Sequence, residues 1–288
     1  MQKYKVLFIG LGRMGFHMSS HLSKNKMIDL YIFNRTNIKT KRWLKSFSAF
    51  EYDFKINIKF DFIITCLKDD GAVELILNKI SKSKSFKTST IFIDHSTISL
   101  DQVKKNNKLI TNKKFHFLDA PVTGGEEGAI KGVLSTMIGG NSSKYNKSLF
   151  ILGCYCKNIV YMGRVGSGQL TKFTNQILIC GILYSISEAN LFSKKNNLNQ
   201  KKLYQAIKNG AAGSWQFMNR YQSINKDKFN FGFSSELMEK DLRYVLKQSY
   251  KNKLDLQLTK DVHKRYKKLL LTKYKDKDTS SLIKSFSK

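Results

Sequence analysis

The stretch "KVLFIGLGRMG", residues 5–15, determines the fold class of this 288-residue chain. Its first part, "KVLFIG" (5–10), is a continuous apolar run that ends in glycine, as is typical of a parallel strand buried on both faces. "GLGRMG" (10–15) follows directly as G-x-G-x-x-G and opens a helical pattern through His21 and Leu22. A strand, a glycine turn and a helix in this order predict the first unit of a doubly wound parallel sheet.

The same alternation continues through the first half of the chain. Further strand-like runs, separated by helix-like segments, are "DLYIFN" (29–34), "FDFIITCL" (60–67), "TIFIDHS" (90–96), "FHFLDAPV" (115–122) and "LSTMIGG" (134–140). Strands that alternate with helices favour an α/β fold with a parallel sheet. Ligands of such sheets bind beyond the carboxyl ends of the strands, where the glycines of this chain lie.

The glycine turn has the features of a dinucleotide site. Gly10 permits the tight turn, Gly12 lets a pyrophosphate approach the backbone, and Gly15 permits close packing of the helix on the strand. The helix N-terminus adds N–H groups and a partial positive charge for the phosphate. A glycine-rich turn without a ligand is the alternative. The expected cofactor contacts here are Gly10, Leu11, Gly12, Arg13, Met14 and Gly15.

The second half of the chain reads as helical. Residues 167–196 form one long apolar helical pattern, and the shorter segments 200–209, 234–252 and 255–272 are also expected to be helices, with a glycine-rich break at "NGAAGSW" (209–215). The sequence therefore predicts an N-terminal Rossmann domain, residues 1–164, and an all-α C-terminal domain, residues 165–288, joined by the long helix.

The composition is strongly basic, with 51 Lys and Arg against 21 Asp and Glu and a formal net charge of +30. Such a charge suggests nucleic-acid binding. The lysines, however, are spread from Lys3 to Lys288 without one dominant basic block, which favours a diffuse solvated surface. We expect no specific nucleic-acid partner, and a functional polyanion site is the alternative.

The four cysteines, Cys66, Cys154, Cys156 and Cys180, are too few for a disulfide scaffold in a chain of this length. No His cluster at metal-ligand spacing accompanies them, so we expect reduced structural thiols and no metal site. The apolar run in "MQKYKVLFIGLG" (1–12) is too short for a signal peptide. We also expect no 18-residue apolar segment, and hence a soluble cytoplasmic protein that does not cross a membrane.

The long helix carries a candidate catalytic face. Lys172, Asn175, Gln176 and Ile179 fall at i, i+3, i+4 and i+7, hence on one side of the helix. Burying an ammonium group is costly and lowers its pKa, so Lys172 could pass a proton to or from a substrate oxygen while Asn175 or Gln176 orients that substrate. The alternative is a lysine that reaches solvent, with two amides at a domain seam.

The stretch "YIFNRT" (31–36) bears on cofactor choice. NAD-binding folds usually end the second strand with Asp or Glu, whose carboxylate holds the ribose 2′-OH. Here Asn34 takes that place and is followed by Arg35 and Thr36. Arg35 can meet a 2′-phosphate with a planar fork, and Thr36 can add a hydroxyl donor. The stretch predicts a preference for NADP, with NAD possible; an ordinary turn with a solvated arginine is the alternative.

Four stretches together resemble the β-hydroxyacid dehydrogenase family. They are the cofactor fingerprint "FIGLGRMGFHM" (8–18), the substrate signature "DAPVTGGEEGAIKGVLSTMIGG" (119–140), the catalytic segment "GQLTKFTNQ" (168–176) and the C-terminal cofactor contact "EKDL" (239–242). The resemblance extends over nearly the whole chain, and four motifs in the right order are more specific than one. It implies Lys172 as the catalytic residue, a small carboxylate substrate, and a homodimer or homotetramer.

The resemblance also implies roles for further residues. Thr123, Gly124 and Gly125 would line the substrate pocket, because bare N–H groups of a glycine turn can bind a carboxylate, and Pro121 would fix the direction of that turn. Contacts to the cofactor are expected from Thr97 near the nicotinamide, Leu67 and Lys68 beside the nucleotide, and Lys240. Trp215 would face the pocket as a wall that selects small substrates, with core packing as the alternative.

Two positions depart from the family pattern. Thr123 stands where Ser is usual, and Gln176 stands where many members have Asn, although tartronate semialdehyde reductases are similar to this chain in having Asn-Gln. Imine reductases share the architecture but usually lack the lysine at position 172, and 6-phosphogluconate dehydrogenase has a much larger helical domain. A non-catalytic dehydrogenase-like module that binds polyanions is the competing function, supported by the +30 charge alone.

Overall fold

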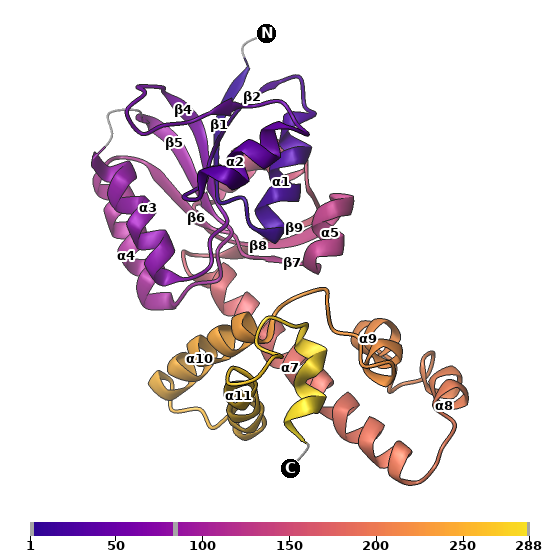
Figure 1. Ribbon diagram of the computed structural model, residues 1–288. Coiled ribbons are helices and arrows are strands. Elements are labelled where there is room, and N and C mark those ends of the chain that lie inside the picture. The colour runs from indigo at the N-terminus through magenta and orange to yellow at the C-terminus, as the bar shows by residue number, and fades with distance from the viewer. Residues whose placement is uncertain (1–2, 83–85, 287–288) are drawn as a thin grey trace. The chain divides into compact units, whose positions relative to one another are not determined.

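The computed structural model describes residues 3–82 and 86–286. The chain divides into two compact units, Met1–Lys172 and Phe173–Lys288, whose elements are labelled in Figure 1.

The first unit is built on one sheet. Within the described residues it has nine strands: β1 (Tyr4–Ile9), β2 (Ile28–Phe33), β3 (Phe50–Glu51), β4 (Phe60–Thr65), β5 (Phe86–Asp94), β6 (His116–Asp119), β7 (Val122–Thr123), β8 (Leu134–Gly140) and β9 (Cys156–Gly163). The order is β3-β2-β1-β4-β5-β6-β8-β7, and β9 pairs with β8. Neighbouring strands are parallel except that β8 runs antiparallel to β6 and β7.

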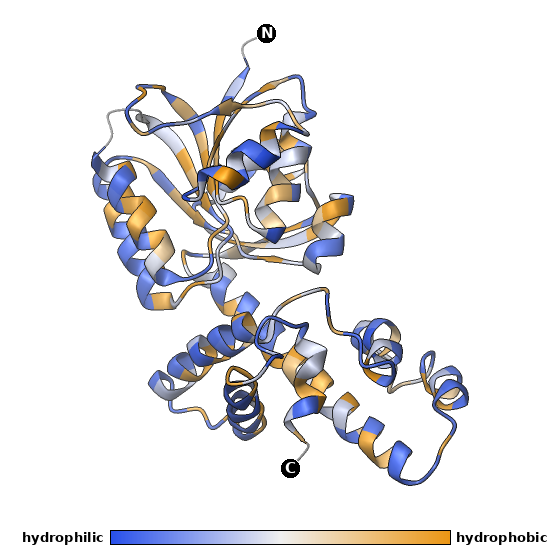
Figure 2. Cartoon of the chain, viewed as in Figure 1, coloured by the Kyte–Doolittle hydropathy of each residue, from blue (hydrophilic) through white to orange (hydrophobic). Residues whose placement is uncertain are grey.

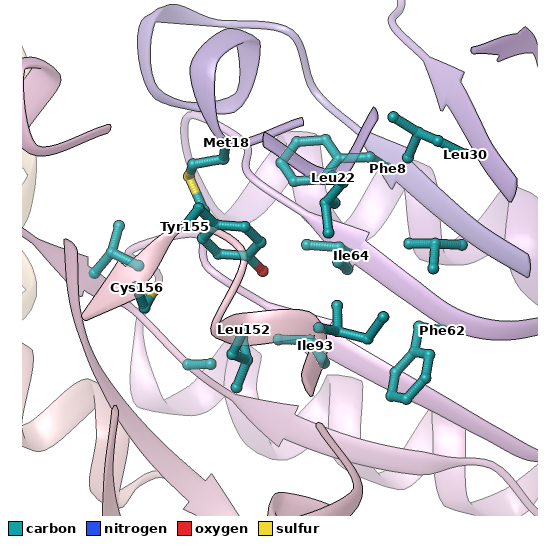
Figure 3. Packing of buried hydrophobic residues seen from close by; sticks show 14 of the residues in the cluster. Phe8, Met18, Leu22, Leu30, Phe62, Ile64, Ile93, Leu152, Tyr155 and Cys156 are labelled. Atoms are coloured by element: carbon teal, nitrogen blue, oxygen red, sulfur yellow. The ribbon is translucent and has the colours of Figure 1, made fainter. Parts of the chain in front are cut away.

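Helices cover both faces of this sheet (Figure 1). Helices α1 (Arg13–Ser23), α2 (Asn37–Leu44), α5 (Gly125–Lys131) and α6 (Ser142–Leu152) contribute to the core on one face, and α3 (Asp70–Lys82) and α4 (Leu100–Asn112) to the core on the other. Side chains along β1 alternate between the two cores: Val6 and Phe8 point into the first core, and Leu7 and Ile9 into the second. Figure 3 shows Phe8 among the side chains of the first core. The doubly wound α/β fold is confirmed.

The second unit is helical, as expected. Its helices are α7 (Ser167–Lys195), which begins in the first unit, then α8 (Gln200–Ile207), α9 (Trp215–Asn225), α10 (Ser235–Lys251), α11 (Gln257–Leu269) and the 3₁₀ helix η1 (Thr279–Ser285). Cys180 and Leu183 of α7 pack against Met238 and Leu242 of α10 and Val262 of α11. The middle of the long helix is thus the centre of this unit's core.

Strands β3 and β9 and helix α9 are among the elements that were not expected from the sequence. Strand β3 has two residues, and both are exposed. Strand β9 is exposed at most positions, so its side chains lack the alternation of a half-buried strand. Helix α9 begins at Trp215, inside the stretch taken as a glycine-rich break, because the hydroxyl of Ser214 accepts a hydrogen bond from the N–H of Phe217 and caps it.

One expectation about α7 is wrong. An 18-residue window of this helix reaches a mean hydropathy of 1.2, so its length and composition would suffice to cross a membrane, although 44% of the window is buried inside the protein. The window qualifies because charged residues are few along α7, which has only Lys172 and Glu188 before Lys194. A core helix of a folded domain meets the same criterion, and the burial of Cys180 and Leu183 is that of a core helix.

Hydrophilic residues are distributed over the helices of both units (Figure 2). Cys66, Cys154, Cys156 and Cys180 are all free thiols. Burial raises the pKa of Cys156 and of Cys180 to about 12, which keeps both as unreactive thiols.

Candidate functional site

Two glycines of the first turn are required by the fold itself. Gly10 follows β1 with a φ of 105°, and a Cβ atom there would lie 2.4 Å from the carbonyl oxygen of Cys66. A Cβ on Gly15, in α1, would lie 1.9 Å from the carbonyl oxygen of Gly10. No side chain fits at either position, so the end of β1, the end of β4 and the start of α1 approach one another closely.

Gly12 is different, because the fold does not require it. Its φ of −75° is available to any residue, and, apart from its chain neighbours, no atom of the described residues lies within 4 Å of the place where its Cβ would be. It is the N-cap of α1, whose first turn contains Arg13 and, in this described segment, no acidic residue. Bare backbone at a helix N-terminus, with space beside it, fits the pyrophosphate of a dinucleotide.

Asn34 joins the glycine turn to the end of β2. Its Oδ1 accepts a hydrogen bond from the N–H of Leu11 at 3.0 Å, and its Nδ2 donates to the carbonyl oxygen of Thr36 at 3.0 Å. Arg35 is exposed beside it, and both residues line a pocket of about 740 Å³ that also includes Tyr52. The amide of Asn34 thus organises the backbone. Arg35 is one of several charged residues that line this pocket, together with Glu51, Asp53, Lys55, Lys79 and Lys82.

The ends of β4 and β5 are linked beside the turn. The N–H of Leu67 donates to Oγ of Ser96 at 2.9 Å, and Asp94 accepts from the hydroxyl of Thr65 at 2.8 Å and from the N–H of Ser96 at 2.9 Å. Burial raises the pKa of Asp94 to about 6, although these hydrogen bonds oppose the rise. Thr97 is half-buried directly after Ser96. The expected residues Leu67 and Thr97 therefore lie on one hydrogen-bonded edge; Lys68, next to Leu67, is exposed.

The "DAPVTGG" stretch forms β7 and the turn into α5. Gly124 and Gly125 both have positive φ, 121° and 63°, and both are exposed. A Cβ on Gly124 would lie 3.1 Å from Cδ2 of Leu134, whereas a Cβ on Gly125 would meet nothing within 4 Å. The carbonyl oxygen of Pro121 accepts from the N–H of Met137 in β8 at 3.2 Å. The turn thus presents exposed glycine backbone without side chains next to the half-buried Thr123.

Lys172 lies in the part of α7 that belongs to the first unit. Its side chain is buried, with 8% exposed. One helical turn further along, the Nδ2 of Asn175 donates to the Oε1 of Gln176 at 2.9 Å. The expected face of α7 therefore exists as one helix with a buried lysine and two coupled amides.

A carboxylate in the second unit holds these amides, and it was not predicted from the sequence. The Nε2 of Gln176 donates to Oδ2 of Asp241 at 2.6 Å, and Asp241 is fully buried. The ammonium of Lys240 lies 3.1 Å from Oδ1 of Asp241, an ion pair without hydrogen-bond geometry. The motif "EKDL" indicated only its lysine; the neighbouring aspartate gives no signal without the contact to α7.

Trp215 begins α9 and is 49% exposed. The guanidinium carbon of Arg220 lies 4.9 Å from the centroid of its ring and 4.7 Å from that of Phe231. Arg220 also pairs with the buried Asp278 at 3.2 Å. The indole is therefore a surface group held by a cation, and core packing does not describe it.

Known proteins share both units of this architecture. Residues 5–163 match the NAD binding domain of 6-phosphogluconate dehydrogenase, and residues 166–286 match the NAD-binding region of NADP-dependent 3-hydroxyisobutyrate dehydrogenase. An uncharacterized oxidoreductase of Shewanella frigidimarina is 34% identical over 99% of this chain and 98% of its own length. The 2-hydroxy-3-oxopropionate reductase of Escherichia coli is 31% identical over 85% of this chain and 84% of its own length.

Among solved structures, 3-hydroxyisobutyrate dehydrogenase of Mycobacterium tuberculosis, determined with L-serine, superposes with a TM-score of 0.89 at 25% identity and covers all of both chains. These matches, together with the glycine turn, place the chain among the NAD(P)-dependent oxidoreductases. Within that class, the chain belongs to the β-hydroxyacid dehydrogenase family.

Proposed function

We propose that this chain moves a hydride between NADP(H) and a short β-hydroxyacid or its semialdehyde, with Lys172 as the general acid and base. The observation that carries the proposal is the buried side chain of Lys172, one helical turn before the coupled amides of Asn175 and Gln176. A nicotinamide cofactor, when bound, supplies or accepts the hydride. The protein must supply the proton and the orientation.

The proton would move at Nζ of Lys172. In the reducing direction the ammonium donates to the carbonyl oxygen of the substrate, and in the oxidising direction the amine accepts the hydroxyl proton. Asp241 fixes the amide of Gln176, which in turn fixes that of Asn175. A fixed amide can orient a substrate oxygen beside the lysine, and orientation of this kind contributes much of the rate of such steps.

The carboxylate of the substrate would bind the turn that follows β7. A Cβ atom on Gly125 would lie in open space, so the backbone is accessible there, and Thr123 is two residues away. Consecutive backbone N–H groups in such a turn form an anion-binding concavity. The relatives named for 3-hydroxyisobutyrate and 2-hydroxy-3-oxopropionate, together with the structure determined with L-serine, support small hydroxy or oxo acids as the substrate class.

The preference for NADP rests on Arg35. It is exposed at the end of β2, where no carboxylate of residue 34 opposes a 2′-phosphate. The match of residues 166–286 to an NADP-dependent enzyme supports the same choice. Lys68, Thr97 and Lys240 are proposed as further cofactor contacts.

A substrate panel tests the proposal. Purified protein is assayed with NADPH and NADH against tartronate semialdehyde, succinic semialdehyde and glyoxylate, and in the oxidising direction with NADP⁺ and NAD⁺ against 3-hydroxyisobutyrate and serine, with Lys172→Ala as a matched blank. We expect turnover of at least one substrate, faster with the phosphorylated cofactor, and loss of it in Lys172→Ala. If the wild type turns over no substrate with either cofactor, the proposal is overturned and the polyanion-binding alternative is favoured. The affinity for duplex DNA at physiological salt would then test that alternative.

Sedimentation of the same preparation tests the proposed homodimer or homotetramer.

A further inference from the structure

The first turn of α7 is capped by a distant carboxylate. The N–H of Gly166 donates to Oδ1 of Asp119 at 2.7 Å, and the N–H of Gln169 donates to Oδ2 at 2.9 Å. Asp119 lies at the end of β6 and has no exposed surface. The first N–H groups of a helix lack partners within it, and a negative charge there also interacts favourably with the helix dipole. Both oxygens of Asp119 are thus used to hold the start of α7.

The backbone around Asp119 is closely packed, with no room for a Cβ atom at two neighbouring glycines. A Cβ on Gly139 of β8 would lie 2.5 Å from Oδ1 of Asp119 and 2.9 Å from the backbone nitrogen of Ser167. A Cβ on Gly168 would lie 2.6 Å from the carbonyl oxygen of Asp119 and 2.4 Å from that of Met137. Two glycines therefore let β6, β8 and the helix approach closely, and the cap has little freedom to move.

The side chain of Gln169 extends the same attachment to another strand end. Its Nε2 donates to the carbonyl oxygen of Ser96 at 2.6 Å, and its Oε1 accepts from the N–H of Ile98 at 3.4 Å. These two backbone groups flank Thr97. Gln169 has no exposed surface, so both hydrogen bonds are shielded from water. The loop that carries Thr97 is therefore fixed to the first turn of α7.

We propose that Asp119 and Gln169 are positioning residues for the reaction: together they fix the turn of α7 that carries Lys172 relative to the loop that carries Thr97. Lys172 follows Gln169 by three residues, about 4.5 Å along the helix axis. The inference rests on the proposed function, because it assigns the two residues to the placement of the proposed proton donor. Neither residue is proposed to touch the substrate or the cofactor.

This role predicts a loss of rate that is larger than any loss of cofactor binding. Asp119→Asn places an amide NH₂ against one of the two helix N–H groups and releases that end of the cap. Gln169→Leu keeps the backbone N–H that binds Asp119 but removes both contacts to residues 96–98. A misplacement of about 1 Å can lower the rate about 100-fold, so we expect kcat to fall about 10- to 100-fold in each variant. The dissociation constant for NADPH should rise by a smaller factor than kcat falls, because residues 10–15 are unchanged and only the proposed contact of Thr97 is loosened.

The test separates positioning from a general loss of folded protein. Thr90→Val is the matched control. Thr90 is fully buried in β5 and donates to the carbonyl oxygen of Phe60, the first residue of β4, at 2.7 Å, whereas Asp119 is the last residue of β6. A merely structural defect lowers the fraction of active molecules and leaves their kinetics unchanged. A positioning defect instead raises the primary isotope effect measured with NADPH deuterated at the transferred position, because the chemical step becomes slower than the other steps.

We expect lower kcat and a larger isotope effect in Asp119→Asn and Gln169→Leu, and neither change per active molecule in Thr90→Val. If Asp119→Asn does not fold, Gln169→Leu decides alone, because it leaves the cap in place. Wild-type kcat and isotope effect in Gln169→Leu, with Lys172→Ala inactive, would overturn the positioning role and leave the proposed function standing. Full activity of Lys172→Ala would instead show that the proposed proton donor is wrong.

Discussion

Changing Arg35 to aspartate tests the proposed cofactor preference at the residue on which it depends. Arg35 is exposed at the end of β2, on the wall of the pocket that Asn34 also lines. The contacts of Asn34 with Leu11 and Thr36 do not involve the side chain of residue 35. The substitution should therefore change the charge at this edge and leave the glycine turn in place.

The expected size of the effect follows from the lost contact. A hydrogen bond to a charged group contributes about 1.5–3 kcal/mol, and each 1.4 kcal/mol is about a factor of ten. Loss of the contact between Arg35 and a 2′-phosphate should thus lower kcat/KM with NADPH about 10- to 100-fold. The new carboxylate also repels the phosphate and can accept a hydrogen bond from the ribose 2′-OH, so NADH should become the better cofactor.

The assay is kcat/KM for both cofactors at a saturating concentration of whichever substrate the panel identifies. Arg42→Asp is the control, because Arg42 is also exposed, lies on the adjacent α2, and changes the net charge by the same amount. Its ratio of NADPH to NADH use should match the wild type. The reasoning is refuted if the wild type prefers NADH, or if both variants shift the ratio equally.

Three further changes test other parts of the site. Gly12→Val should lower the free energy of unfolding by only about 1 kcal/mol, as for a changed helix N-cap, since its Cβ lies in open space, but abolish NADPH binding in a fluorescence titration; retained binding would contradict the pyrophosphate site. Gly125→Ala should raise the KM of the carboxylate substrate at unchanged cofactor affinity, and an unchanged KM would contradict the anion site; Gly124→Val is a poorer test, because its φ of 121° and the nearby Leu134 strain any side chain. Burial raises the pKa of Asp94 to about 6 and that of Asp119 to about 7, so both carboxyls bind protons more tightly in the folded state than in the unfolded state. The stability that they contribute should therefore be full below pH 3.8 and should decline as the pH rises to about 7. Denaturant unfolding across this range should show a smaller decline in Asp94→Asn than in the wild type, and equal slopes would contradict the assignment.

The parts of the fold that the sequence predicts are those whose cause is local. Residues 6–9 are all apolar because this part of β1 is buried on both faces, and Gly10 and Gly15 are required by contacts with neighbouring segments. Strand β9 gave no pattern because it is mostly exposed, and α9 was hidden by the glycines before its cap at Ser214. Such elements depend on tertiary pairing or on a single capping hydrogen bond, which composition does not show.

The candidate site also has a part that the sequence predicts and a part that it does not. Lys172, Asn175 and Gln176 could be grouped from helical spacing alone, and α7 does carry them as one helix. Asp241 could not be added, because its contact with Gln176 spans 65 residues. Asn34 was predicted as a cofactor contact in place of the usual carboxylate, and the hydrogen bond by which its amide ties Leu11 to the end of β2 was not foreseen. Long-range hydrogen bonds of this kind leave no periodicity in the sequence.

The turnover of Lys172→Ala, measured together with its affinity for NADPH, tests the central claim most directly. General acid–base catalysis contributes about 10²- to 10⁴-fold, so kcat should fall by that factor. The dissociation constant for NADPH should be unchanged, because the turn from Gly10 to Gly15 does not involve α7. A kcat close to that of the wild type would contradict the assignment of Lys172 as the group that transfers the proton.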